Sequence, residues 1–416
     1  MNTHLIFDPL QDRKLKLDNG LTVLLKRYST LPLVSIQVWV KVGSIYESEE
    51  INGISHFLEH MVFKETSKYT STVISKKIEY YGGIINAGTS KEYTVYYIDI
   101  PKEGIKDAID VLSQLVFYAT FPDEEIQKEK NVIIEEIKRL EDQPMNVLYE
   151  NFNALLFTKT PYKWRIIGRK ENIQSFTKNQ VKEFYQNFYH PQNMVLSICG
   201  DINYEEIEKL IRESFGKING FSYTKSIKSD LKEDPKSDII EIKKHKVQHL
   251  YFLCGFLGPN INEFEQYAGD ITSVILGEGV SSRLYKILRE EKKLVYEIHS
   301  GFYTQMGPSV FYILGICEPQ NFEEAIRAIK NVISNLKTEG PTEEELIKAK
   351  NILLTRWYLN NENVHSIAST LAWWEMFLSL DAANSYIENI NNVSKEDVKN
   401  FLEKYGGYLV TTGLQP

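Results

Sequence analysis

The amino-acid sequence predicts an α+β protein with two related domains, and two observations lead to this prediction. The chain has 416 residues, more than one ordinary hydrophobic core accommodates, so two domains of about 200 residues are expected. The second half also repeats part of the first, because FPDEEIQKEKN at 121–131 is echoed by GPTEEELIKAKN at 340–351. We therefore expect an N-terminal domain at 1–216, a linker at 217–236 rich in Lys, Ser, Asp and Gly, and a C-terminal domain at 237–416.

The first domain alternates strand-like and helical patterns along its length. Runs rich in β-branched and apolar residues predict strands at 21–27, 34–43, 85–101 and 194–200. Apolar residues spaced three and four apart predict helices at 54–64, 71–81, 106–119, 124–140, 146–157, 179–188 and 204–215. Such a mixture of strands and helices in each half is what the α+β class requires.

Composition and charge exclude several classes of function. The net charge is −8 and the lysines form no basic block, so nucleic acid is not an expected partner. Residues 1–17 lack the apolar core of a signal peptide, and no run approaches the ~20 apolar residues of a membrane span. The cysteines, Cys199, Cys254 and Cys317, lie in apolar strand-like runs and predict buried reduced thiols. We expect a cytoplasmic protein without a membrane partner.

The segment His56-Phe57-Leu58-Glu59-His60 carries the main chemical signal. In a helix, residues three and four apart share one face, so His56, Glu59 and His60 project together. The rest of the segment is apolar on nearly every side, so the helix should be buried, where a lone carboxylate is costly. A dication bound by two imidazoles and a carboxylate supplies a partner, and His-x-x-Glu-His is the inverzincin pattern. The alternative is two core histidines with a capping glutamate.

A catalytic zinc usually has three protein ligands and one open position, so a third ligand must come from elsewhere in the chain. The helix predicted at 124–140 has an apolar face formed by Ile126, Ile133, Ile137 and Leu140. Glu136 flanks this face, whereas Glu135 points almost opposite, so Glu136 is the better candidate ligand. Glu129 flanks the same face and is expected to orient a ligating histidine; the alternative is a surface charge between two lysines.

The second half shows no equivalent metal motif. When Asn131 is matched to Asn351, Glu136 falls opposite Arg356, and no second His-x-x-Glu-His occurs. We therefore expect only the first domain to carry metal chemistry.

These features resemble the pitrilysin family of metallopeptidases, which includes insulin-degrading enzyme and the mitochondrial processing peptidases. HFLEHMVFKET is similar to the metal helix of that family, and Glu136 follows His60 by 76 positions, close to the usual gap. The resemblance implies that His56, His60 and Glu136 bind one Zn²⁺ per subunit. It also implies that Glu59 is the general base and Glu129 the auxiliary catalytic glutamate.

The resemblance extends to the fold and to the association of subunits. The chain is similar to the short subfamily, in which each subunit has two homologous domains, each with a mostly antiparallel sheet packed with helices. Such subunits pair into a clam-shell dimer. A homodimer is the expected assembly, and pairing with a related subunit is the alternative.

Further residues are implied to contact substrate. SSRLYKILREEKKLVYEIHS contains Arg289 and Tyr296 at the spacing of a family pair that binds peptide and stabilises the tetrahedral intermediate, reaching the active site from the partner subunit. The alternatives are a helix-surface charge and a strand packing residue. GGIINAGTSKEYTVYY resembles the family's exposed substrate strand, on which Asn86 and Ala87 touch the peptide. Either residue alone is as consistent with a structural edge strand.

Two other features of the sequence do not add to the predicted site. His245 and His249 are four apart, but the segment 239–256 has a strand pattern, which would hold them about 13 Å apart, so they are not predicted to bind metal together. Thr160 stands where the family often has histidine, and its consequence is not evident from the sequence.

Together these observations predict a zinc-dependent endopeptidase that hydrolyses unfolded peptides inside a dimeric chamber. Glu59 is expected to take a proton from water and return it to the leaving amine. The alternative is a non-catalytic assembly subunit similar to the processing peptidases.

Overall fold

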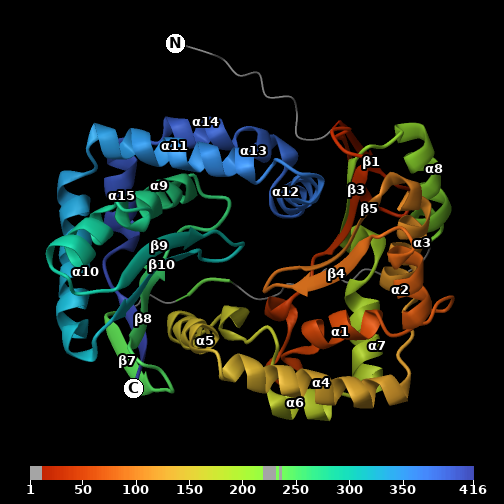
Figure 1. The fold of residues 1–416 in the computed structure, drawn as a ribbon, viewed down its shortest axis with the longest axis horizontal. Coiled ribbons are helices and arrows are strands. Elements are labelled where there is room, and N and C mark those ends of the chain that lie inside the picture. The colour runs from red at the N-terminus through yellow and green to blue at the C-terminus, as the bar shows by residue number, and fades with distance from the viewer. Residues whose placement is uncertain (1–11, 219–230, 234–236) are drawn as a thin grey trace. The chain divides into compact units, whose positions relative to one another are not determined.

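The computed structural model describes residues 12–218, 231–233 and 237–416, so most of the predicted linker at 217–236 lies outside the described residues. The chain forms two compact units, each with one β-sheet and its own helices (Figure 1). The first unit gathers the described residues of Met1–Ile137, Trp164–Lys228 and Tyr358–Asn384, and the second gathers those of Lys138–Lys163, Ser229–Trp357 and Ser385–Pro416.

The first sheet has six strands in the order β1-β2-β6-β3-β5-β4. Their bounds are β1 Arg13–Lys16, β2 Thr22–Arg27, β3 Leu33–Val40, β4 Ile84–Thr89, β5 Thr94–Pro101 and β6 Met194–Gly200. Only the β2–β6 pair is parallel, and the other pairs are antiparallel. The central strands β3 and β6 are buried almost throughout, because α3 and α12 pack on the sheet from opposite sides (Figure 1).

The second sheet has five strands in the order β7-β11-β8-β10-β9. Their bounds are β7 Ile239–Lys244, β8 Leu250–Leu257, β9 Glu297–Tyr303, β10 Val310–Cys317 and β11 Val410–Gln415. The pair β7–β11 is parallel and the others are antiparallel. Strand for strand, this repeats β2-β6-β3-β5-β4 of the first sheet, including the single parallel pair. The topology confirms the predicted α+β class with two homologous domains and mostly antiparallel sheets.

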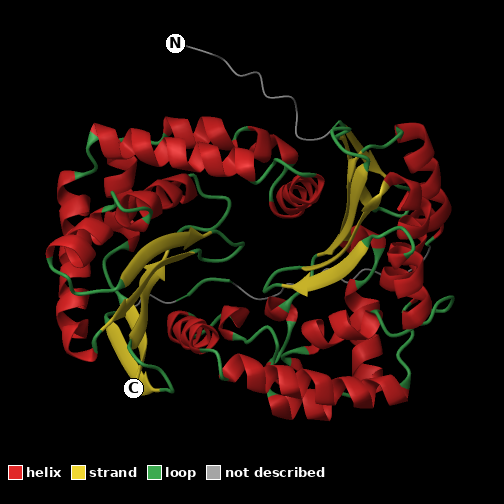
Figure 2. Ribbon diagram, in the orientation of Figure 1, coloured by secondary structure: helices red, strands yellow, loops and turns green. Residues whose placement is uncertain are grey.

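The helices surround the two sheets (Figure 2). In the first half of the chain they are α1 Ile54–Val62, α2 Ser71–Glu79, α3 Ile105–Tyr118, α4 Asp123–Glu141, α5 Pro144–Leu156, α6 Lys170–Ser175, α7 Lys178–Phe188 and α8 Tyr204–Ser214. In the second half they are α9 Glu265–Gly277, α10 Phe322–Glu339, α11 Glu343–Leu359, α12 Val364–Phe377, α13 Leu380–Asn384, α14 Tyr386–Asn392 and α15 Lys395–Tyr405. A π-helical turn, Tyr285–Glu291, precedes β9. Each helix predicted in the first half is present within a few residues of its expected bounds.

Two helices belong to units that the order of the chain does not suggest. Helix α5 packs on β8 and β11 of the second unit, and α12 packs on β3 and β6 of the first unit. Helix α5 comes from the first half of the chain and α12 from the second, so the two units exchange one helix each. The exchange is symmetric, because the contacted strands are equivalent in the two sheets. The continuous domains predicted at 1–216 and 237–416 did not include this exchange.

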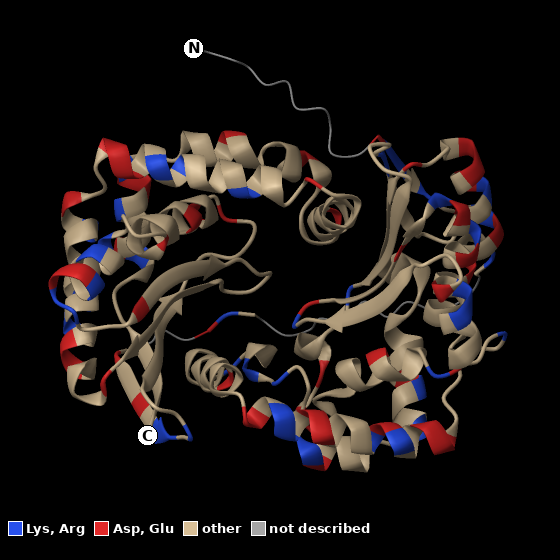
Figure 3. Cartoon of the chain, in the orientation of Figure 1, with Lys and Arg blue, Asp and Glu red and all other residues tan. Residues whose placement is uncertain are grey.

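Two further expectations concern the surface and the core. Within the described residues, no helix combines the length and the apolar character needed to cross a membrane. Acidic and basic residues are interspersed along the helices, for example on α4 and α8 (Figure 3). Cys199, Cys254 and Cys317 are buried and unpaired, as predicted.

Candidate metal centre

Helix α1 begins at a tightly packed turn. Gly53 has a φ of 100°, a left-handed conformation that favours glycine, and a Cβ there would lie 2.8 Å from the backbone of Gly168. The buried Glu47 carboxylate accepts hydrogen bonds from the backbone N–H groups of Gly53, at 2.7 Å, and Ser55, at 2.8 Å. An acid at this end of a helix satisfies free N–H groups and complements the helix dipole. The start of α1 is therefore firmly held.

The apolar residues of α1 are buried in the core, so the opposite face, which carries the two histidines, lies against α4. Phe57, Leu58, Met61 and Val62 are fully buried. His56 and His60 are partly accessible on the face that meets α4, with their side chains 13% and 22% exposed. The two helices lie side by side in Figure 1. The predicted helical spacing therefore places both imidazoles on one face, as expected.

Glu136 of α4 completes a cluster with the two histidines. Its Oε2 lies 4.0 Å from His56 Nε2 and 3.7 Å from His60 Nε2. One ligand atom from each residue lies within 4.8 Å of the other two, and no other cluster of three or more His, Cys, Asp or Glu side chains within the described ranges has this spacing. The three residues predicted as metal ligands are therefore close together in the structure.

The cluster fits a zinc ion. Tetrahedral zinc with Zn–N and Zn–O bonds of about 2.0–2.2 Å has ligand atoms roughly 3.3–3.6 Å apart. The observed separations of 3.7 and 4.0 Å differ from these values by only a few tenths of an ångström. Two imidazoles and one carboxylate are also the ligand set of known catalytic zinc sites that keep an open position.

Glu129 is a buried partner of His60. Its side chain is only 3% exposed, so the alternative of a surface charge is wrong. One carboxylate oxygen lies 2.7 Å from His60 Nδ1 and the other lies 2.5 Å from Lys64 Nζ. A carboxylate on Nδ1 leaves Nε2 of the same ring directed at Glu136, where a metal ligand is needed. Lys64 was not anticipated from the sequence; it lies four residues after His60, just past the end of α1.

The two histidines have opposite electrostatic surroundings. Burial, reinforced by the proximity of His60, lowers the pKa of His56 to about 3, so its ring is neutral at physiological pH. Burial also lowers the pKa of His60, but the hydrogen bond that His60 Nδ1 donates to Glu129 and the charges of Glu59 and Glu136 outweigh it and leave the pKa raised. A neutral His56 is ready to bind a cation, and a proton on His60 would compete with one.

Glu59 lies on the same helix, three residues after His56 and directly before His60, but it has a different partner. The Thr89 hydroxyl at the end of β4 donates to Glu59 Oε2 at 2.5 Å. Burial raises the pKa of the Glu59 carboxyl group, whereas the Thr89 hydrogen bond and His60 act in the opposite direction. A carboxylate with a raised pKa is a stronger base than an exposed one. The contact with Thr89 was missed from the sequence.

Strand β4 is an edge strand, as the sequence suggested. It pairs with β5 only, among the strands described. Ser90 N–H donates to Tyr93 O at 2.7 Å across the turn, so antiparallel alternation leaves the backbone groups of Ile85, Ala87 and Thr89 facing the free edge. The Asn86 side chain accepts the Ala87 N–H at 2.9 Å. Asn86 and Ala87 therefore lie on an open edge, and their contact with a peptide remains a prediction.

Arg289 and Tyr296 lie in the second unit. Arg289 lies in the π-helical turn with its guanidinium 4.8 Å from the centre of the Tyr285 ring. Tyr296 directly precedes β9, is 48% exposed, and donates its hydroxyl to Glu318 at 2.5 Å. The His249 ring lies 4.8 Å from the Tyr296 ring. Both predicted residues are accessible, and their role in substrate binding remains a prediction.

The predicted continuous strand at 239–256 is wrong. Strand β7 ends at Lys244 and β8 begins at Leu250, because the chain crosses β11, which lies between them. His245 and His249 therefore lie at the ends of a connecting loop. His249 Nδ1 is 3.3 Å from Glu318, and His245 Nε2 is 3.4 Å from the carbonyl oxygen of Glu141.

Thr160 also has a structural role that the sequence did not reveal. Its side chain is buried, and its N–H and hydroxyl both donate to Glu233 Oε1, at 2.7 and 2.8 Å. The neighbouring Tyr162 hydroxyl accepts the Gly307 N–H at 2.8 Å. Threonine at this position therefore anchors a distant segment of the second unit.

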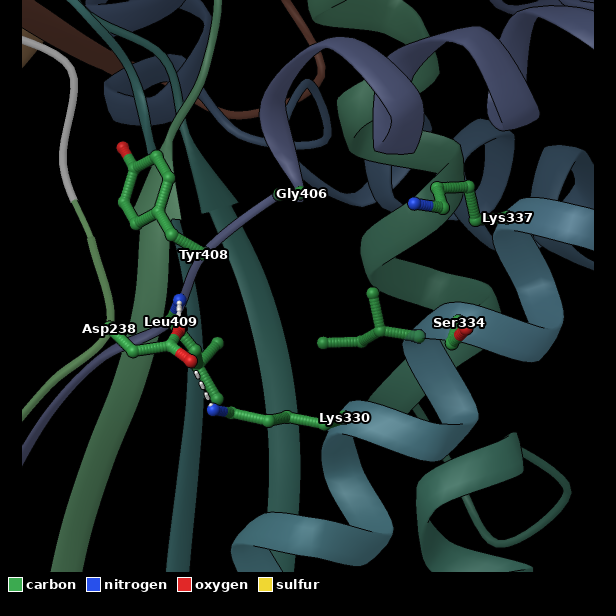
Figure 4. Close-up of a pocket in the computed structure, with 9 residues that line it drawn as sticks. Asp238, Lys330, Ser334, Lys337, Gly406, Tyr408 and Leu409 are labelled. Carbon is green, nitrogen blue, oxygen red and sulfur yellow. Dashed lines mark hydrogen bonds and ion pairs between the residues drawn. The ribbon is translucent and has the colours of Figure 1, made fainter.

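A small cavity of about 160 Å³ lies beside α10 in the second unit (Figure 4). Within it, Asp238 accepts the Leu409 N–H at 2.8 Å and pairs with Lys330 at 2.6 Å. None of the residues predicted for the site lines this cavity, so it is separate from the metal centre.

The fold and the cluster together define a class of protein. Two homologous α+β domains, one carrying a His, His, Glu cluster beside an open edge strand, are the arrangement of a two-domain metallopeptidase. Sequence profiles support this class: Insulinase (Peptidase family M16) matches residues 22–170, and Peptidase M16 inactive domain matches residues 175–353. The chain belongs to peptidase family M16, the pitrilysin family.

Individual relatives cover nearly the whole chain. A Bacillus subtilis (strain 168) protein named uncharacterized zinc protease YmxG is 31% identical over 400 residues, which are 94% of this chain and 96% of that protein. An uncharacterized zinc protease of Rickettsia felis is 30% identical, with 96% of each chain covered. The crystal structure of a protease from Helicobacter pylori has a TM-score of 0.90 at 25% identity, covering 97% of this chain and 99% of its own.

Proposed function

We propose that this protein is a zinc-dependent endopeptidase that cleaves unfolded peptides. The observation that carries the proposal is the cluster of His56, His60 and Glu136, whose ligand atoms lie within 4.8 Å of one another. These three residues would hold the ion. When bound, zinc acts as a Lewis acid and lowers the pKa of a water in its open position. Both relatives are named uncharacterized zinc proteases, and these names support the choice of zinc.

Glu59 is the proposed general base. Its half-buried carboxylate takes a proton from the attacking water and returns it to the amine that leaves. Glu129 keeps the His60 ring oriented through Nδ1. The open edge of β4 supports binding of an extended peptide by backbone pairing, which is largely indifferent to side chains. A folded protein could not supply such a strand, so unfolded peptides are the proposed substrates.

The first experiment measures metal and cleavage together. The purified protein is expected to contain one zinc per chain and to cleave a quenched, unstructured peptide. A chelator should reduce cleavage to background, and one equivalent of zinc should restore it. Undiminished activity after complete metal removal would contradict the zinc chemistry. Stable zinc binding without cleavage of any peptide in a mixed pool would instead support a non-catalytic subunit.

We further propose that Arg289 and Tyr296 act on substrate held by the partner subunit of a homodimer. Both side chains are accessible in the second unit, and a cation and a phenol suit a developing oxyanion. The test mixes two inactive variants, Glu59→Gln and Arg289→Ala. In a random mixture about a quarter of wild-type activity should return, because half the dimers are mixed and one of their two sites is intact.

The matched control for this experiment is Lys286→Ala, which removes another exposed cation from the same helical turn. It should remain active alone. If the Glu59→Gln and Arg289→Ala mixture stays inactive although subunit exchange is demonstrated, Arg289 does not act across a dimer. A monomeric mass in solution for the active protein would lead to the same conclusion.

A further inference from the structure

Thr89 makes two hydrogen bonds to the proposed base. Its hydroxyl lies 2.5 Å from Glu59 Oε2, and its backbone N–H also donates to the same carboxylate. An ionised carboxylate only accepts, so the threonine is the donor in both contacts. Glu59 belongs to α1 and Thr89 is the last residue of β4, so the contact links two elements that are 30 positions apart in the chain.

The contact restricts a side chain that would otherwise rotate freely. Glutamate has three rotatable bonds, and fixing them costs conformational entropy unless hydrogen bonds offset it. The Thr89 hydroxyl therefore fixes the position of Oε2 and, with it, the plane of the carboxylate. Near the carboxylate lies a buried pair of phenols, Tyr96 and Tyr189, whose hydroxyl oxygens are 2.7 Å apart. Burial raises the pKa of both phenols, and the charge of Glu59 adds to the shift, so they stay protonated.

Thr89 also marks the end of the open edge of β4. The outward backbone groups are those of Ile85, Ala87 and Thr89, and the last of these is already directed at Glu59. A peptide that pairs with β4 would therefore run toward the carboxylate. The same residue ends the binding edge and holds the base.

We propose that Thr89 is a positioning residue that fixes the Glu59 carboxylate through its hydroxyl and ties it to the edge strand on which the peptide lies. This inference rests on the proposed endopeptidase function. It assigns to the hydroxyl, and not to the bulk of the side chain, a contribution to turnover. Misplacing a catalytic group by about 1 Å can cost roughly 100-fold in rate.

The test compares Thr89→Val, which keeps the shape but removes the donor, with Thr89→Ser, which keeps the donor. Thr89→Val should lower kcat by about 10- to 100-fold and leave KM within about twofold. Thr89→Ser should stay within about threefold of the wild type in both constants. Thr72→Val, the same change at an exposed position of α2, is the matched control and should be unaffected.

Two readouts that do not depend on turnover accompany the kinetics. The zinc content and the melting temperature of Thr89→Val should match those of the wild type. Its affinity for a peptide, measured on the chelator-treated protein, should also be unchanged, because the hydroxyl serves the base and not the peptide. A large loss of peptide affinity would show that Thr89 shapes the edge strand and would overturn the proposal.

The kinetic outcomes separate this inference from the function on which it rests. An active wild type with a normal kcat for Thr89→Val contradicts the inference alone. An equal fall in kcat for Thr89→Val and Thr89→Ser also contradicts it, because the hydroxyl would then not be what matters. A wild type that holds no zinc and cleaves no peptide contradicts the proposed function, and this inference with it.

Discussion

Replacing Glu59 by Gln is expected to abolish peptide cleavage while the protein keeps its zinc. The amide cannot take a proton from water, and loss of a general base costs about 100- to 10,000-fold in kcat. Folding should survive, because the amide oxygen can still accept the Thr89 hydroxyl that Glu59 accepts now. The measurements are kcat on a quenched peptide, zinc by elemental analysis, and the melting temperature.

The control for this variant is Glu135→Gln, an exposed glutamate on α4. It makes the same chemical change near the site and should keep both zinc and activity. Cleavage by the Glu59→Gln protein at the wild-type rate would remove Glu59 from the mechanism. Loss of zinc together with activity would assign Glu59 to metal binding instead.

Replacing His60 by Ala is expected to remove both zinc and activity. The variant loses one of three proposed ligands, and it leaves the buried Glu129 carboxylate with only Lys64 of its two partners. Glu136→Gln should behave in the same way, because Glu136 Oε2 faces both imidazoles. Dialysis against zinc followed by elemental analysis measures the loss directly.

Glu129→Gln, on the same helix as Glu136, is expected to weaken zinc binding without abolishing it. It leaves all three ligands in place and removes only the carboxylate on His60 Nδ1. Such an outer partner typically contributes 10- to 100-fold to metal affinity, so competition with a chelator should reveal weakened binding of about that size. One equivalent of tightly bound zinc in His60→Ala would contradict the assignment of the cluster, whatever its activity.

Much of the first domain could be predicted from local pattern. The helical repeat of three and four residues correctly located α1 to α5, α7 and α8, because an amphipathic helix must place its apolar residues on one side. The same repeat placed His56, Glu59 and His60 on one face. The prediction of one continuous strand at 239–256 was wrong, because an uninterrupted strand-like pattern does not show where a chain turns to cross another strand.

The contacts between distant elements could not be predicted in this way. Thr89 and Glu59, Lys64 and Glu129, and Thr160 and Glu233 are pairs of ordinary polar residues. The sequence singled out Glu59 and Glu129, but nothing in the local surroundings of their partners distinguishes those partners from exposed residues of the same type. Their partners are determined by which elements pack together, and the exchange of α5 and α12 likewise left no local mark.

The sequence by itself determined the chemistry that this protein carries: the ligand types, their helical spacing and the duplicated framework follow from residue identity and from the geometry of single helices and strands. Only the tertiary structure decided that Glu136 lies 3.7 Å from His60 and that Glu129 is buried against the same ring. The physical reason is that a metal site needs several side chains within a few ångströms, and burial of two apolar helix faces far apart in the chain brings them there.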